Sequence, residues 1–461
     1  MSSDEAARSA RPAPSDVLGR VRAWLDDHSH SALAQRVAGT AFLIRVASAA
    51  ILYLSQVLLA RWMGSYEFGI YVYVWTWVLL VGGLLDLGLG QSAQKFIPEF
   101  AGRGELARLR GFLAGSRWLA GGVATGAAVV AAVVITATAP WLDSYLVLPL
   151  YLACLCLPVY AVGSVLDGMG RSYNWLHLGM VPPYILRPLL LLALMGIAQL
   201  AGLPVTAQNA MLAAVGAIWL STVLQIVLLN RRLHREVPRG PKVYEPRVWL
   251  ATSLPIFLVE SFYLLLTYTD LIMLQQSHSP HEIAVYYAGA KTLALVAFVN
   301  FSVSAAVAHR FTEYHVSGDR ERLSNFLAES IRWTFWPSLA ATTLILVLGK
   351  PLLWLFGPEY GDGYPIMFVL AVGLLARAAI GPVERLLNML GQQNLCAMVY
   401  AGSFLLNLLG CLLLIPRWGG LGAAVSTATA LVVESILLFV VTKRRLGLHV
   451  FIWCRKPQAA G

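Results

Sequence analysis

The chain has 461 residues, of which 58% are hydrophobic and only 13% are charged. Since about a quarter of the residues in a soluble domain are charged, this composition excludes an ordinary soluble protein and indicates an integral membrane protein. The net charge of +10 could suggest nucleic-acid binding, but the basic residues are concentrated in the tails and in alternate loops. That asymmetry is the one that orients membrane helices, so it argues against a nucleic-acid partner.

Runs of about 20 apolar residues predict membrane-spanning helices. Twelve such runs follow one another along the chain, and the loops between them are too short to hold a soluble catalytic domain. The sequence therefore predicts an all-α membrane protein that is not an enzyme. In chain order the expected spans are 39–60, 68–90, 112–137, 146–166, 178–200, 206–229, 249–274, 284–308, 334–355, 364–383, 394–415 and 419–442.

The tails and the longest loop are basic or polar. Residues 1–38 are expected to form a cytoplasmic tail, in which Asp16 either caps a short surface helix or belongs to a plain polar segment. Twelve spans place both termini on one side, and the basic loops make that side cytoplasmic. The expected organisation adds two six-helix lobes to this tail, 39–230 and 249–442, with a basic linker between them and a basic tail at 443–461.

No metal or cofactor site is expected. His278 and His281 form a weak metal-binding pair without further ligands, and a loop explains them better. The cysteines have no disulfide or metal spacing and lie in spans or in the last tail; they are Cys154, Cys156, Cys396, Cys411 and Cys454.

The two halves of the chain resemble each other. The segment EFGIY at 67–71 matches EIAVY at 282–286, an offset of 215 residues. The segment at 98–113 then matches the segment at 312–327 with six identical positions. Because six spans separate the equivalent segments, both halves have the same orientation in the membrane. Parallel repeats of this kind are related by an axis along the membrane normal, and transporters bind their substrate between them.

Three stretches resemble the polysaccharide-export flippases of the multidrug/oligosaccharidyl-lipid/polysaccharide exporter superfamily. They are LLARWMGSYEFGIYVY (58–73), DLGLGQSAQKFIPEF (86–100) and NLLGCLLLIPRWGGLGAAVSTATA (407–430). The resemblance extends over about residues 36–445. It implies two pseudo-symmetric lobes around a central cavity, alternating access, and a lipid-linked oligosaccharide on a polyprenyl (pyro)phosphate that moves from the inner to the outer leaflet. The lipid II flippases of the same superfamily have fourteen spans, whereas this chain is expected to have twelve, so it differs from them.

The resemblance also implies a setting. The protein would lie in a bacterial inner membrane and serve O-antigen or exopolysaccharide assembly. Its partners would be the lipid-linked oligosaccharide and bilayer lipids, together with a polysaccharide polymerase, a chain-length regulator and a coupling ion, H⁺ or Na⁺.

Cations within apolar spans are the candidate ligands of the substrate phosphates. They are Arg45, Arg187, Lys291 and Arg377. A charge in hydrocarbon costs roughly 2.5–3.5 kcal/mol on insertion scales, so each needs a reason. A wet cavity that binds an anionic head group supplies one, because guanidinium and ammonium groups bind phosphate oxygens.

Arg45 has two further explanations. It lies six residues from the start of its span, about 9 Å at 1.5 Å per residue, so its side chain could reach the inner surface. It could also pair with Asp86 on the returning helix. Arg187 could instead satisfy carbonyl groups freed by the prolines around it.

The other two cations differ in their neighbours along the chain. Lys291 has no acid nearby in sequence, which favours the cavity. Arg377 could pair with Glu384, seven residues further on.

Acidic residues within spans are candidates for gating or ion coupling. The 215-residue offset places Arg45 opposite Glu260 and Ser55 opposite Asp270, so Arg45 and Glu260 could form a latch between the lobes, or each could pair within its own lobe. Asp86 is the alternative partner of Arg45. Asp270 lies near the outer end of its span, where it could be merely interfacial. Glu434 is expected to be a buried, hydrogen-bonded acid.

Two other functions stay open. A cation-coupled multidrug exporter of the same superfamily would need acids rather than basic residues in its cavity. A scaffold that binds lipid without transport would have the same sequence features.

Overall fold

The computed structural model of the protein describes residues 30–300, 303, 307 and 320–453. The side chains of residues 30–43, 45, 320 and 389 lie outside this description, as do most of the second repeat segment and the expected N-terminal surface helix. Residues 1–46 and 47–461 form separate units. The cavities discussed below all lie in the second unit.

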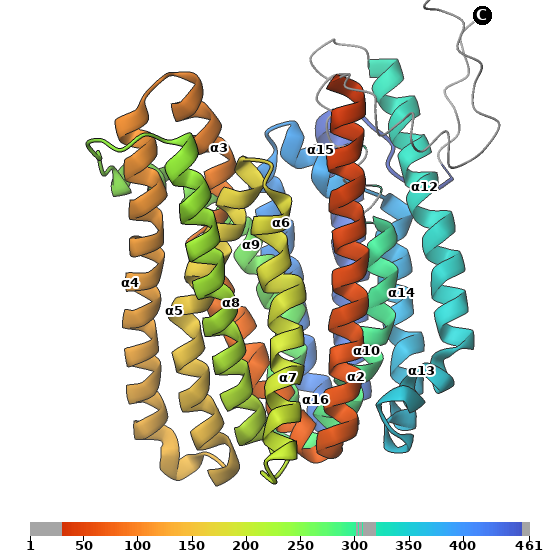
Figure 1. Ribbon diagram of the computed structural model, residues 1–461. Coiled ribbons are helices and arrows are strands. Elements are labelled where there is room, and N and C mark those ends of the chain that lie inside the picture. Colours follow the sequence, from red (N-terminus) through yellow and green to blue (C-terminus); the bar gives the residue numbers. More distant parts are fainter. Residues whose placement is uncertain (1–29, 301–302, 304–306, 308–319, 454–461) are drawn as a thin grey trace, which may run out of the picture. The chain divides into compact units, whose positions relative to one another are not determined.

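The described residues are nearly all helical and include no strand. The first half of the chain forms α2 (His30–Leu84), α3 (Leu89–Gly102), α4 (Leu106–Thr138), α5 (Ser144–Ser172), α6 (Leu176–Val181), α7 (Arg187–Leu200) and α8 (Ala207–Glu236). The second half forms α9 (Pro246–Leu274), α10 (Pro280–Leu293), α12 (Arg320–Val347), α13 (Gly349–Phe356), α14 (Tyr364–Ile380), α15 (Val383–Met389) and α16 (Gln393–Leu446). Figure 1 shows these helices running side by side.

Among the described residues, nine helices are long and apolar enough to cross a bilayer, or ten if the bent pair α12–α13 counts as one span. Two of the nine are 57 and 54 residues long, whereas a single crossing needs about 20. Each of these two contains a glycine with non-helical geometry, Gly64 in α2 and Gly419 in α16. Since each holds two crossings, the fold is compatible with the expected twelve.

Two expected spans are interrupted. Helix α12 ends at Val347, and α13 continues at an angle of 63°, so the span 334–355 is a broken one. The span 68–90 breaks after Leu84, because Leu87 and Gly88 take positive φ angles of 54° and 71°. The Asp86 carboxylate stabilises this turn by accepting a hydrogen bond of 2.8 Å from the Gly88 backbone N–H.

The helices pack into two groups. In the first group α4 and α8 both pack on α5, α3 packs on α4 and α5, and α7 packs on α8. Helix α2 joins this group, because Glu67 accepts a hydrogen bond of 2.7 Å from the Ala207 backbone N–H of α8 and Arg187 of α7 lies over the Trp75 ring. In the second group α16 packs on α9, α14 and α15, while α14 also contacts α10 and α12. Figure 1 shows α4, α5 and α8 on one side and α12, α13 and α14 on the other. These groups correspond to the expected lobes, whose boundaries remain a prediction.

Helix α9 joins the two groups. It begins against the first group, where the Trp249 ring lies edge-on to Phe112 at 5.5 Å between centroids, and where a Cβ on Gly88 would come within 2.9 Å of the Ser253 carbonyl oxygen. Further along, α9 packs on α16 of the second group. The helix therefore changes partners along its length, and Pro255 lies near this change.

The basic end of the molecule, where α8 ends and α9 begins, contains Arg231, Arg232, Arg235, Arg239 and Lys242. The opposite end, near Gly64, brings the two groups together. There Arg61 donates to the Leu355 carbonyl oxygen at 2.7 Å, the Ser65 backbone N–H donates to Glu359 at 3.0 Å, and the Ser65 hydroxyl is hydrogen-bonded to His281 at 2.7 Å.

Gly69 shows how closely the groups approach. A Cβ at this position would lie 1.8 Å from the Pro280 carbonyl oxygen at the start of α10. Only glycine permits this approach of two backbones. The glycine of EFGIY thus has a packing role that its repeat partner, an alanine, does not share.

Candidate substrate cavity

A cavity of about 250 Å³ lies between the two groups of helices, with walls from α2, α9, α10, α14 and α16. The first group contributes Gln56, Tyr71, Trp75 and Thr76, all from α2. The second group contributes Lys291, Arg377 and Asp270 among other residues. The cavity is thus lined mainly by aromatic and apolar side chains, with a few charged groups, as ligand sites usually are.

The cavity follows the internal repeat. Six pairs of positions separated by 215 residues contribute both members to its lining: Gln56 and Leu271, Tyr71 and Tyr286, Val72 and Tyr287, Trp75 and Ala290, Thr76 and Lys291, and Leu79 and Ala294. This correspondence is the pseudo-symmetry expected from the sequence, seen at the level of side chains. The positive charge of the cavity does not follow this symmetry, because Lys291 in the second half corresponds to the uncharged Thr76 in the first.

Lys291 lies near the middle of the candidate membrane span Pro280–Asn300. It is eleven residues into α10, about 16 Å from the start of that helix. Its ammonium nitrogen lies 5.2 Å from the centroid of the Tyr287 ring, where the electrons of the ring attract a cation. Within the described part of the chain, no carboxylate forms an ion pair with it, although Asp270 attracts it at longer range. The side chain is half-buried and lines the cavity, so an anion could reach it.

Asp270 is buried rather than interfacial, and only 6% of its surface is exposed. Its carboxylate accepts hydrogen bonds from the Tyr286 hydroxyl, from the Thr427 hydroxyl at 3.0 Å and from the Leu271 backbone N–H at 2.7 Å. Three donors satisfy much of its hydrogen-bonding capacity. The alternative of a merely interfacial position does not account for these contacts, because α16 brings a threonine to this carboxylate that the sequence of α9 does not reveal.

Arg377 lines the same cavity and is also held by acids. Its guanidinium lies 3.5 Å from the Glu434 carboxylate and 3.4 Å from the Glu384 carboxylate, and it donates to the Tyr400 hydroxyl at 3.3 Å. It also lies over the Tyr263 ring, at 5.4 Å from the centroid. The alternative of pairing with Glu384 is therefore correct, and pairing does not remove the residue from the cavity.

Glu260 lines a second hollow of about 350 Å³ on the second group. Glu384 and Arg385 line it as well, and the hollow shares four residues with the central cavity: Tyr263, Ala297, Leu374 and Arg377. Arg377 thus forms part of the wall between two connected spaces. Glu260 is exposed within this hollow. Its predicted partner Arg45 has its side chain outside the described structure, so the latch stays a prediction.

Arg187 lies in the first group, apart from the other cations. Its guanidinium carbon is 5.7 Å from the Trp75 ring centroid and 5.5 Å from that of Tyr160. As far as the described residues show, these rings, rather than the carbonyl groups freed by the prolines, are its partners. It lines a small cavity of about 70 Å³ together with Asp167 and Gln225. Trp75 separates this cavity from the central one, because it contacts Arg187 and lines the central cavity.

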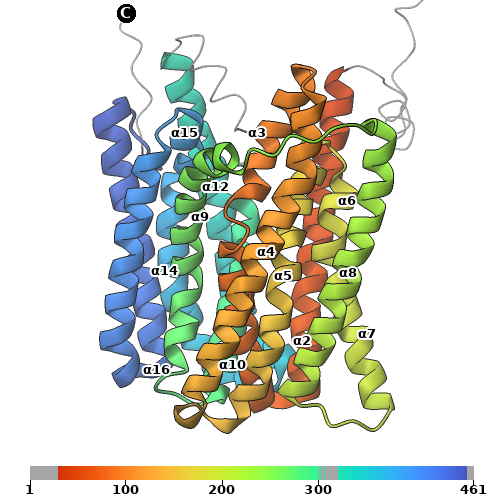
Figure 2. The same cartoon turned by 90° about the vertical axis from the view of Figure 1, so that its left-hand side faces the viewer.

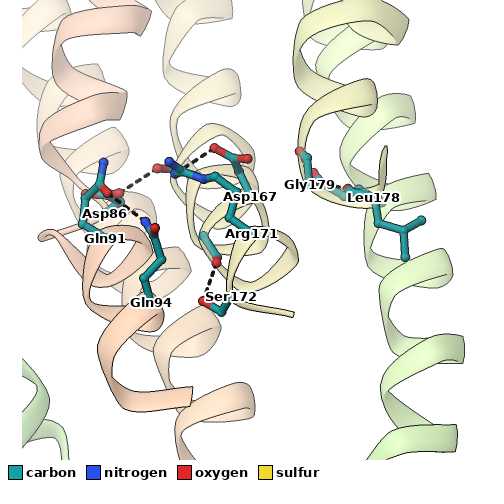
Figure 3. Close-up of polar contacts among 11 residues, drawn as sticks. Asp86, Gln91, Gln94, Asp167, Arg171, Ser172, Leu178 and Gly179 are labelled. Carbon is teal, nitrogen blue, oxygen red and sulfur yellow. Dashed lines mark hydrogen bonds and ion pairs between the residues drawn. The ribbon is translucent and has the colours of Figure 1, made fainter. Parts of the chain in front are cut away.

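Asp86 belongs to a polar cluster inside the first group (Figure 3). It accepts a hydrogen bond of 2.6 Å from the Ser164 hydroxyl of α5. Close by on the same helix, Arg171 and Asp167 form an ion pair of 3.0 Å. The Ser164 hydrogen bond joins the turn before α3 to α5, whereas the Arg171–Asp167 pair lies within α5. The Ser164 contact gives Asp86 a structural role in the turn before α3, and its suggested pairing with Arg45 remains outside the described structure.

Glu434 was expected to be a buried, hydrogen-bonded acid, and it has no exposed surface. It pairs with Arg377, 57 residues away, at 3.5 Å, but within the described structure neither of its oxygens has a hydrogen-bond partner. Two other important side chains were not singled out from the sequence. Thr427 completes the Asp270 site from α16. Arg117 lies in a predicted span, yet it was not listed with the other cations; its position inside the run 112–137 was the available signal.

His278 and His281 contact different parts of the structure. His278 is 3.1 Å from Glu282 and is hydrogen-bonded to the Ile415 carbonyl oxygen at 2.9 Å. His281 contacts Ser65 of the first group. In the residues that the structure describes, no group of three or more potential metal ligands is found.

Comparison with known proteins gives a family match. A family model described as polysaccharide biosynthesis protein matches residues 37–315, and a model described as MatE matches residues 255–413. The probable low-salt glycan biosynthesis flippase Agl15 of Haloferax volcanii is 24% identical over 167 residues. That match covers 36% of this chain and 34% of the relative, so the chain matches only about a third of that protein.

Two solved structures share the fold. An inward-facing multidrug resistance MATE family transporter of the MOP superfamily superposes with a TM-score of 0.73 at 14% identity, covering 88% of this chain and 98% of that one. The lipid II flippase MurJ, in an inward closed conformation, superposes with a TM-score of 0.65 at 13% identity, covering 87% of each chain. At such identities the similarity concerns the fold alone.

Proposed function

The chain belongs to the polysaccharide biosynthesis protein family, and we propose that it is a flippase for a lipid-linked oligosaccharide. The substrate would be a glycan on a polyprenyl phosphate or diphosphate, moved from the inner to the outer leaflet by alternating access. The protein would lie in a bacterial inner membrane with both termini in the cytoplasm. Its product would enter O-antigen or exopolysaccharide assembly.

The position of Lys291 on the central cavity is the main observation that supports this proposal. An anionic, sugar-bearing head group cannot cross hydrocarbon unaided, so a transporter must offer a polar space with fixed positive charge. Lys291 lines a cavity between the two groups of helices near the middle of a candidate membrane span, with no ion pair to a carboxylate among the described residues. An ammonium in that position supplies a phosphate with three hydrogen-bond donors and a charge.

Aromatic rings around the cavity fit the same substrate. Tyr71, Trp75, Tyr268 and Tyr287 all line it. Aromatic faces pack on the apolar faces of sugar rings, and tyrosine hydroxyls can hydrogen-bond sugar hydroxyls. The polyprenyl chain can remain in the bilayer while the head group occupies the cavity.

Arg377 would serve as a second phosphate ligand. In the present conformation two carboxylates neutralise its guanidinium. An arriving diphosphate would compete with Glu384, which is only partly buried, and Glu434 would keep the guanidinium in position. Glu260, Asp86 and Asp270 are the acids that could respond to a coupling ion. H⁺ and Na⁺ both remain candidates.

Alternating access requires an interface that opens. The contacts of Arg61, Ser65 and His281 between the two groups lie at the end opposite the basic loops. Two of them are hydrogen bonds to side chains, and beside them the buried Phe68 ring packs against Tyr287 and Tyr360, so opening this end would separate these rings as well. Breaking them would let the cavity open at that end, which we propose to be the outer leaflet. A polymerase and a chain-length regulator would receive the glycan there.

A cation-coupled multidrug exporter is the second candidate. The MatE match at residues 255–413 and the acid Asp270 in the cavity favour it. However, three hydrogen bonds already occupy the Asp270 oxygens, and Lys291 offsets part of the Asp270 charge at longer range, so this carboxylate offers a cationic drug few free oxygen lone pairs. A lipid-binding scaffold without transport is the third candidate.

The experiment that tests the flippase proposal is transport in proteoliposomes. A fluorescent polyprenyl-diphosphate disaccharide is followed from one leaflet to the other for the wild type, Lys291→Gln and Lys350→Gln. Lys350 is a matched control, because its ammonium also lies near a tyrosine ring, 5.6 Å from the centroid of Tyr364, but it does not line the cavity. The proposal expects Lys291→Gln to lower the initial flipping rate about tenfold, because the variant loses about one charge-assisted hydrogen bond to the substrate.

Three other results would each favour a different conclusion. Equal rates for both variants would remove Lys291 from the mechanism. Efflux of a cationic dye without glycolipid movement would favour the multidrug exporter. If the wild type binds the glycolipid but does not flip it, the lipid-binding scaffold becomes the preferred function.

A further inference from the structure

The largest of the four cavities described lies away from the central one, at the basic end of the first group. Its volume is about 710 Å³, and it shares no lining residue with the central cavity. Helices α4 and α8 form its sides. Since both pack on α5, Val162 of α5 lies at the floor. We refer to this space as the α4–α8 groove.

The lining of the α4–α8 groove is strongly basic. It includes Arg110, Arg117, His234, Arg239 and Lys242, and it includes neither aspartate nor glutamate. Some basic residues outside the groove at this end are paired with acids. Arg108, for example, lies 3.0 Å from Glu105 and 3.3 Å from Glu245. The groove therefore concentrates positive charge that nearby acids do not neutralise.

Arg117 lies deepest of these cations, three turns inside α4. Its Nε donates to the Leu113 carbonyl oxygen at 2.7 Å, and its Nη1 donates to the Asn230 side-chain oxygen at 2.7 Å. Both acceptors are neutral, so they orient the guanidinium without cancelling its charge. The groups that remain on the guanidinium fork match the oxygens of a phosphate.

The membrane side of the groove is apolar. Leu113, Trp118 and Ile226 line it, and 81% of the Trp118 surface is exposed. An exposed tryptophan beside basic groups is typical of the level where lipid headgroups meet acyl chains. The groove therefore has a charged part next to an apolar part, as a phospholipid has a charged headgroup next to its acyl chains.

The segment between α8 and α9 covers the charged part. Figures 1 and 2 show it running from the end of α8 across the end of α4. Arg110 holds it there by donating to the carbonyl oxygens of Pro238 at 2.7 Å and Pro241 at 3.3 Å, and the Val243 backbone N–H donates to the Ala107 carbonyl oxygen at 3.0 Å. Arg239 and Lys242 lie on this fixed segment, so their charges are kept beside the groove.

We propose that the α4–α8 groove is a binding site for an anionic phospholipid of the bilayer. Its phosphate is bound by Arg117, Arg239 and Lys242, and its acyl chains lie along Trp118 and Leu113. Basic pockets between membrane helices on the cytoplasmic side are suited to such headgroups. The substrate lipid is a poorer occupant, because a head group here would lie outside the space between the two groups of helices and could not follow alternating access.

The test measures lipid binding to purified full-length protein in detergent. Phosphatidylglycerol or phosphatidylcholine is titrated, and bound lipid is counted by native mass spectrometry. The variants are Arg239→Gln with Lys242→Gln, and separately Arg117→Gln. The matched control is Arg444→Gln with Arg445→Gln, which removes two exposed charges at the end of α16, away from the groove.

The wild type should retain one phosphatidylglycerol in preference to phosphatidylcholine. Arg239→Gln with Lys242→Gln should weaken that binding about 25-fold, about fivefold for each cation. The control pair, which lies outside the groove, should leave the binding nearly unchanged. Because Arg239 and Lys242 are exposed, this pair can be tested even if Arg117→Gln fails to fold.

Two results would overturn the proposal. If the groove variants and the control pair bind phosphatidylglycerol equally, the preference comes from the general charge of the surface. If undecaprenyl phosphate displaces the bound phosphatidylglycerol and the groove variants lose glycolipid flipping in proportion, the groove belongs to the substrate path instead.

Discussion

Thr76 of α2 and Lys291 of α10 occupy equivalent positions of the two repeats, 215 residues apart, and both line the central cavity. The cavity therefore has a pseudo-twofold frame and an asymmetric charge. If the ammonium group of Lys291 binds a substrate phosphate, the helix that carries it should matter less than its presence in the cavity.

Moving the charge across the pseudo-axis tests this point. Lys291→Thr should lower glycolipid flipping about tenfold, the loss of one charge-assisted hydrogen bond. Adding Thr76→Lys should recover part of the rate, because the ammonium again faces the cavity. The measurement is the initial flipping rate in proteoliposomes. If the double variant is no faster than Lys291→Thr, the two positions are not functionally equivalent.

Gly69 should be intolerant of a side chain. Alanine would place its Cβ 1.8 Å from the Pro280 carbonyl oxygen, so the two backbones would have to separate. We expect Gly69→Ala to lower the free energy of unfolding by about 2 kcal/mol or more, as overpacked sites do. Gly122→Ala is the control, since nothing lies within 4 Å of its Cβ. Thermal unfolding in detergent measures both, and equal midpoints would contradict the close approach.

The Arg377–Glu434 pair should show strong coupling. Glu434 has no exposed surface, and removal of one partner from a buried ion pair costs about 3–5 kcal/mol. Glu434→Gln should therefore destabilise the protein strongly, and Arg377→Gln with Glu434→Gln should be more stable than the sum of the single changes predicts. A double-mutant cycle on denaturant unfolding measures the coupling. Additive single effects would mean that the two groups do not interact.

The contact between Ser65 and His281 should separate during transport. Ser65→Cys with His281→Cys, joined by a short thiol cross-linker, should stop flipping, and reduction of the linker should restore it. The native hydrogen bond of 2.7 Å places the two side chains within reach of each other. The two single cysteine variants are the controls. Full activity of the cross-linked protein would show that this end of the molecule stays closed throughout the cycle.

The sequence predicted the fold class well, because apolar length and the repeat are strong signals. The turns at Gly64 and Gly419 lie where the expected spans end. The broken helix at Leu348 was not predicted, although Gly349, Lys350 and Pro351 follow the break directly. A glycine, a charge and a proline in succession were the signal for a change of direction.

The candidate site was predictable only in part. Lys291 stands out in its span, and the structure places it on the central cavity. Thr427, a partner of Asp270, and Glu434, a partner of Arg377, both come from α16, 157 and 57 residues away from them along the chain. No local pattern in the sequence predicts such pairings. Whether a buried charge is free or neutralised depends on these distant contacts.

The most direct test of the central claim measures whether Lys291 recognises phosphate. The affinity of the purified protein is compared for undecaprenyl phosphate and for undecaprenol, which has the same chain without the charge, in the wild type, Lys291→Gln and Lys350→Gln. We predict that the wild type and Lys350→Gln prefer the phosphate by about tenfold, the value of one charge-assisted hydrogen bond, and that Lys291→Gln loses this preference. An unchanged preference in Lys291→Gln would contradict the claim that this lysine binds the substrate phosphate.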